Sequence, residues 1–184
     1  MEKKRRKRGE NSYLNDFHPN LAGEYIYDGA LYACTADADA RKALKRRLWV
    51  CAALLLIAAV VSGSIPAPGM LNCFYVILPF LFELIAAVTV AWAAVRLGRD
   101  WDAVREYVYE RSVTVLPGRA MAAAVCAAAG FLCEIIYLAV SGHDGQPLYA
   151  ALYLLLKALS LLCALTIHRL VRRSDWVKVT KSEQ

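Results

Sequence analysis

The sequence predicts an all-α integral membrane protein, a four-helix transmembrane bundle with both termini on the same side of the membrane. Of its 184 residues, 59% are apolar, and most of these gather in four long runs. A helix needs about 20 mostly apolar residues to cross a bilayer, and each run approaches that length. All but one of the 22 Lys and Arg residues lie outside the runs and fall on one side of the resulting bundle.

The predicted spans are residues 48–65, 73–95, 120–140 and 148–167. They must be helical, because lipid offers no hydrogen-bond partner to unpaired backbone N–H and C=O groups. The runs also lack the alternation of polar and apolar residues that strands of a membrane barrel show. The first span is not a cleaved signal peptide, since a long polar segment separates it from the basic run at 3–8. We expect it to be a signal anchor.

The basic residues predict the orientation. Residues 1–47, 96–119 and the tail 168–184 carry them, whereas the loops 66–72 and 141–147 carry none. Cytoplasmic segments are enriched in Lys and Arg, so both termini and the middle segment are expected in the cytoplasm. The run at 3–8 precedes four spans, so we expect it to meet anionic lipid headgroups and not nucleic acid, at about 1 kcal/mol per basic residue. An anionic inner leaflet suits the plasma membrane, which is the expected location.

Two cytoplasmic helices are predicted beside the spans. One starts at Thr35, a residue type that caps helix N-termini, and runs into the first span. The other covers 100–111, where Trp101, Val104 and Val108 share one face. That face predicts an amphipathic helix at the membrane surface, with packing against the rest of the loop as the alternative.

Short matches in the same order suggest that a two-helix hairpin was duplicated. Residues 24–27 (EYIY) recur at 106–109 (EYVY), and 96–101 (RLGRDW) resembles 169–176 (RLVRRSDW). Two spans return the chain to the same side, so the halves would be parallel repeats. An ancestor of this kind would have paired with itself. A second copy of the chain and another membrane subunit are therefore both candidate partners besides the lipid bilayer.

Three ionisable residues fall inside the spans and form the candidate site. Counted at 1.5 Å per helical residue from the outer, non-cytoplasmic ends of the spans, Glu83 and Lys157 lie at a depth of about 15 Å. Glu134 lies at a depth of about 9 Å. A charge at such depth is costly, so the three are expected to face the bundle and meet one another. Tyr137 and Ser160 lie on the same helical faces and offer hydroxyl groups.

The cluster has two readings. It either fixes the packing of the helices or contacts another subunit, or it forms a proton, cation or substrate site. No catalytic, cofactor or metal motif is present, and the six cysteines do not form a disulfide framework. The lead hypothesis is therefore a non-enzymatic accessory, scaffold or regulatory membrane subunit. The alternatives are a small proton- or cation-coupled transporter or channel, and an enzyme acting on lipid or isoprenoid at the inner interface.

Overall fold

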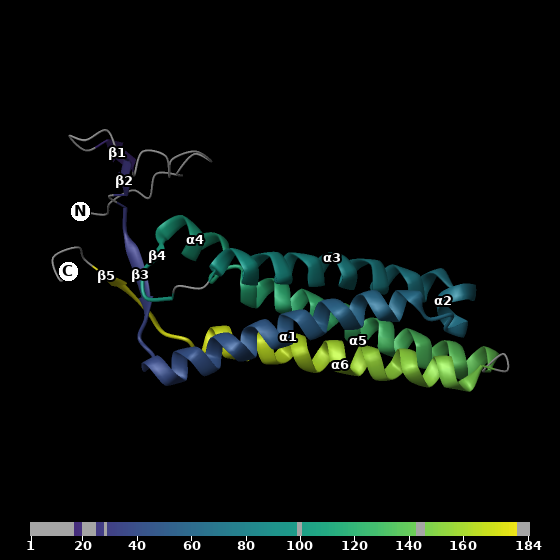
Figure 1. The fold of residues 1–184 in the computed structure, drawn as a ribbon. Helices are drawn as coiled ribbons and strands as arrows, with labels where there is room; N and C mark the ends of the chain where they lie inside the picture. The colour runs from purple at the N-terminus through teal and green to yellow at the C-terminus, as the bar shows by residue number, and fades with distance from the viewer. Residues whose placement is uncertain (1–16, 20–24, 28, 99–100, 143–145, 180–184) are drawn as a thin grey trace, which may run out of the picture.

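Four long helices form an antiparallel bundle in the computed structural model, which describes residues 17–19, 25–27, 29–98, 101–142 and 146–179 (Figure 1). The helices are α1 (Ala38–Ser64), α3 (Phe74–Leu97), α5 (Leu116–Ser141) and α6 (Pro147–Arg172). Each packs on two neighbours, in the cyclic order α1, α3, α5, α6. All four are long and apolar enough to cross a membrane, which confirms the four predicted spans as helices.

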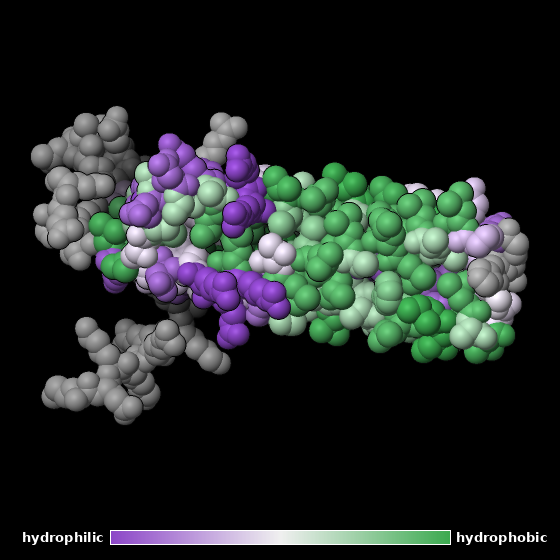
Figure 2. Space-filling view, turned by 90° about the horizontal axis from the view of Figure 1, so that it is seen from below, coloured by the Kyte–Doolittle hydropathy of each residue, from purple (hydrophilic) through white to green (hydrophobic). Residues whose placement is uncertain are grey.

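The face of the bundle seen in Figure 2 is apolar over most of its length. Large side chains on three different helices point outward, with Ile57 57%, Trp92 65% and Leu162 64% exposed. Exposing apolar area to water costs about 25 cal/mol per Å², and lipid removes that cost. Hydrophilic residues instead gather at one end, which we call the basic end (Figure 2). The described strands before α1, the segment β4–α4 between α3 and α5, and the strand β5 after α6 all lie there (Figure 1).

The helix predicted from Thr35 begins three residues later, at Ala38, and continues without a break to Ser64. Thr35 does not cap it. Both the backbone amide and the hydroxyl of Thr35 donate to the carbonyl oxygen of Asp175, each at 3.1 Å. The predicted continuity from the basic segment into the first span is confirmed.

Small β-sheets at the basic end correct the all-α prediction. β3 (Leu31–Cys34) lies between β4 (Val104–Arg105) and β5 (Trp176–Val179), and both pairings are antiparallel. β1 (Phe17–Pro19) and β2 (Tyr25–Tyr27) form a separate antiparallel pair. Since β3, β4 and β5 come from three separate parts of the chain, this three-stranded sheet, which we call the central sheet, holds these parts together.

The helix predicted over 100–111 is shorter in the structure. Only α4 (Glu106–Arg111) is helical, because the backbone of Val104 and Arg105 pairs with β3. Trp101 and Val104 are buried, at 3% and 4% exposure, in the same core as Leu97. The apolar face of this segment therefore packs on the protein itself, which matches the alternative reading of the sequence.

At the opposite end, which we call the distal end, a short helix closes the bundle. α2 (Pro68–Asn72) lies in the predicted loop 66–72 and packs on α3 and α5 (Figure 1). Pro68 and Gly69 are buried there. This contact brings backbone amides close to the polar interior.

Candidate functional site

The three ionisable residues predicted to lie inside the bundle are all fully buried. Glu83 on α3, Glu134 on α5 and Lys157 on α6 are each 0% exposed. The side chains therefore face the bundle interior and not the surrounding surface, as their cost in lipid predicts.

Lys157 and Glu83 form a direct ion pair. The Nζ atom of Lys157 lies 2.6 Å from Oε2 of Glu83, and neither side chain is exposed. Nζ also donates to Oγ of Ser62 on α1, at 3.3 Å. The ammonium group thus joins α1, α3 and α6. Removing one partner of a buried pair typically costs about 3–5 kcal/mol, because the remaining charge has no counter-ion.

Two aromatic rings complete the surroundings of the ammonium group. The centroids of the Phe80 and Tyr153 rings each lie 4.9 Å from Nζ of Lys157. A desolvated cation over a ring face gains on the order of 2 kcal/mol. Phe80 lies one turn before Glu83 on α3, and Tyr153 one turn before Lys157 on α6. The same two helices therefore supply both the charges and the rings.

A glycine of α5 lies beside the lysine stem. A Cβ atom at Gly130 of α5 would lie 3.6 Å from Cε of Lys157 and 3.7 Å from the Tyr153 hydroxyl. These are ordinary van der Waals distances, so an alanine would also fit at this position. The predicted face of small residues on α5 therefore contacts the lysine stem.

Glu134 has a different partner from the one expected. Its Oε1 accepts a hydrogen bond from the backbone amide of Gly69 in α2, at 3.3 Å. A Cβ atom at Gly69 would lie 2.1 Å from Oε2 of Glu134, so the carboxylate rests directly on this glycine. Among the described residues Lys157 pairs with Glu83 alone. The expected carboxylate–ammonium–carboxylate cluster is therefore an ion pair with a separate carboxyl contact beside it.

Tyr137 and Ser160 also lie inside the bundle, with different partners. The Asn72 side-chain amide donates to the Tyr137 hydroxyl at 3.1 Å, so Tyr137 belongs with Glu134 under α2. Ser160 is 1% exposed, and its hydroxyl has no partner among the described residues. The same holds for Oε1 of Glu83 and the hydroxyl of Tyr153. These three oxygen atoms are buried without a hydrogen-bond partner in the described part of the chain. Each such unsatisfied group costs about 1–3 kcal/mol.

Sequence reasoning did not identify three of these contacts. They are the contacts of Ser62, Phe80 and Gly69. A serine, a phenylalanine or a glycine in an apolar run is common, and only the packing of α1 and α2 shows what each one touches. The helical spacing Phe80–Glu83 and Tyr153–Lys157 was visible in the sequence and points to aromatic neighbours one turn from each charge.

Comparisons with models of protein families, with functionally described proteins and with solved structures give no match to this chain.

Proposed function

We propose that the chain is a non-enzymatic accessory, scaffold or regulatory subunit of a membrane assembly. In this proposal it crosses the plasma membrane four times with both termini in the cytoplasm. The bundle serves as a self-contained anchor, and partners bind at the basic end. The observation that carries the proposal is that Lys157 and Glu83 neutralise each other inside one chain, at 2.6 Å and with no exposed surface.

The closed surroundings of the pair favour this reading over transport. A transport site opens to water first on one side of the membrane and then on the other. Here the Phe80 and Tyr153 rings, the Ser62 hydroxyl and the Glu83 carboxylate enclose the ammonium group. The pair also needs no charge from another subunit. The interior charges therefore act within the chain, and partner contacts are expected elsewhere.

The central sheet offers such a contact surface. β5 pairs with β3 on one side, and no other strand among the described residues pairs with its other side. Val177 in β5 is 55% exposed. An open strand edge accepts an extended segment of another protein through main-chain hydrogen bonds. We take an extended peptide segment of a membrane subunit as the partner that this edge fits.

One observation favours the second candidate, a proton- or cation-coupled transporter or channel. Oε1 of Glu83, the Tyr153 hydroxyl and the Ser160 hydroxyl are buried without partners around Lys157. In another arrangement of the helices these oxygens would be ligands for a proton or a small cation. The candidate site residues would then be functional and not structural.

An experiment with a charge-free bundle separates the two functions. Lys157→Met combined with Glu83→Leu removes both charges without leaving either one unpaired. We expect this variant to co-purify in mild detergent with the same subunits as the wild type, and wild-type proteoliposomes to show no proton or cation flux above protein-free liposomes. A flux that the wild type carries and the folded double variant lacks would establish transport and refute the scaffold.

We also infer that the bundle arose by duplication of a hairpin. The cyclic packing order places α1 and α5 at equivalent positions, and likewise α3 and α6. The matching exit segments lie together: the Trp101 and Trp176 rings are 5.5 Å apart, and β4, which follows Trp101, and β5, which begins at Trp176, flank β3 on opposite sides. This arrangement supports parallel repeats.

A further inference from the structure

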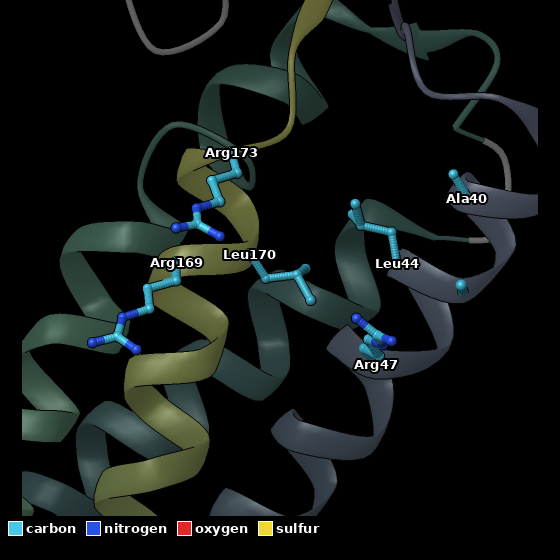
Figure 3. A pocket seen from close by; sticks show the side chains of 7 residues that line it. Ala40, Leu44, Arg47, Arg169, Leu170 and Arg173 are labelled. Carbon is cyan, nitrogen blue, oxygen red and sulfur yellow. The ribbon is translucent and has the colours of Figure 1, made fainter.

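Three arginines line a pocket of about 400 Å³ between α1 and α6 at the basic end (Figure 3). Arg47 comes from α1, Arg169 from the last turn of α6, and Arg173 is the residue that caps the C-terminus of α6. Figure 3 shows the guanidinium groups of Arg169 and Arg173 directed the same way, away from α1, while Leu170 on α6 and Leu44 on α1 lie between the two helices. Ala40 and Ala43 complete the α1 wall, where their small side chains leave the space open.

The positive charge of the pocket has no counter-charge in the described part of the chain. None of the three arginines forms an ion pair there. The two nearby carboxylates that do form pairs are engaged with other residues, Asp102 with Arg41 and Asp39 with Lys42. Three arginines at neighbouring ends of α1 and α6 carry like charges that repel each other, and a bound anion would relieve that repulsion. A guanidinium also matches phosphate oxygens with two parallel hydrogen bonds.

The pocket lies at the ends of two apolar runs, which is the level at which lipid phosphates are expected. Arg47 directly precedes the first apolar run, and Arg169 follows the end of the last one by two residues. Below the pocket, Leu54 and Leu162 are exposed, at 39% and 64%. Each lies seven residues from a pocket arginine, which is two helical turns and hence the same face. The charged pocket at the basic end is thus followed by an apolar surface toward the distal end. A phospholipid needs this order, because its headgroup is charged and its acyl chains are apolar.

We propose that this pocket binds the phosphate headgroup of one anionic phospholipid, with the acyl chains along the outer faces of α1 and α6. Basic pockets between transmembrane helices are suited to such headgroups. The site differs from diffuse attraction of the basic 3–8 run because it holds one lipid in one place. It requires only that the bundle is embedded in a bilayer, so it stands apart from the scaffold proposal.

Native mass spectrometry of the full chain tests the site, in micelles with equal amounts of phosphatidylglycerol and phosphatidylcholine. We expect one phosphatidylglycerol to remain on each wild-type chain. Arg47→Gln with Arg173→Gln should lower its retention about 30-fold, which corresponds to ~2 kcal/mol for two basic residues. The matched control is Arg46→Gln with Arg172→Gln, because these exposed neighbours carry the same charge and do not line the pocket. The control should retain lipid like the wild type.

A second variant tests the cavity apart from its charge. Ala43→Leu adds a side chain to the pocket wall and keeps all three arginines, so lipid retention should fall although the net charge is unchanged. Equal losses in the two arginine double variants would overturn the site and leave only general charge attraction. Displacement of the lipid by an equal concentration of inorganic phosphate would also contradict it, since the site would then select free phosphate.

Discussion

At the residue scale, the buried pair of Lys157 and Glu83 explains why a lysine is tolerated in the middle of a span. Its charge is balanced at 2.6 Å, and its remaining contacts are a hydroxyl and two ring faces. Glu134 belongs to a separate arrangement, in which α2 supplies a backbone amide. The two carboxylates should therefore respond differently to substitution.

The contact between Gly69 and Glu134 gives the first prediction. Gly69→Ala should lower the free energy of unfolding by about 1–3 kcal/mol, because the new Cβ displaces the Glu134 carboxylate and leaves buried polar atoms unpaired. Gly118→Ala is the control, since nothing lies within 4 Å of a Cβ there. Denaturant titration in micelles measures both. The Gly69→Ala cost should shrink in a Glu134→Ala background, and an unchanged cost would contradict the contact.

At the element scale, the sheet at the basic end depends on aromatic packing between distant segments. The Tyr32 and Tyr109 rings stack with centroids 4.2 Å apart, and Trp176 lies 5.7 Å from Tyr109 and 5.5 Å from Trp101. Cys34 is opposite Trp176 in the strand register and is 3% exposed. Its thiol therefore reports whether β3 and β5 stay together.

Trp176→Ala should open the sheet without disturbing the bundle. Loss of a large aromatic side chain costs about 3–5 kcal/mol where it is well buried and less where it is half-buried, as here. In a chain whose other five cysteines are alanine, maleimide labelling of Cys34 should become several-fold faster. Trp92→Ala removes an outward-facing tryptophan of α3 and should leave the rate unchanged. The same rate in both variants would refute the role of Trp176.

The long elements could be predicted from the sequence, and the short ones could not. Each span is set by its own apolar run, and the helix from the basic segment into α1 follows from continuous local propensity. The strands have two to four residues, and β4 became a strand only because β3 lies beside it. In the site, the depths of Glu83 and Lys157 predicted their pairing. The partner of Glu134 depended on α2, a fold of the loop that no local pattern indicates.

At the scale of the whole molecule, the distribution of charge predicts one orientation. The basic end carries the arginine pocket and the sheet, and the distal end carries α2 with Leu71 65% exposed. Segments rich in Lys and Arg stay in the cytoplasm. The scaffold proposal requires this orientation, because its partner surface lies at the basic end.

Single cysteines on a cysteine-free chain test the orientation in intact cells. A membrane-impermeant maleimide should label Leu71→Cys from outside the cell, because Leu71 lies on α2 at the distal end, which the proposed topology places outside. It should label Lys178→Cys in β5 only after the membrane is permeabilised. The reverse pattern would place the sheet outside the cell and contradict the proposed topology.

The central claim is that the Lys157–Glu83 pair holds the bundle together from within, and a double-mutant cycle tests it most directly. The quantity measured is the free energy of unfolding in micelles. We predict that Lys157→Met lowers it by about 3–5 kcal/mol and that adding Glu83→Leu restores most of the loss, because no charge is then left unpaired. Adding Glu134→Leu instead should restore nothing. A Lys157→Met protein as stable as the wild type, or equal recovery with either second substitution, would contradict the claim.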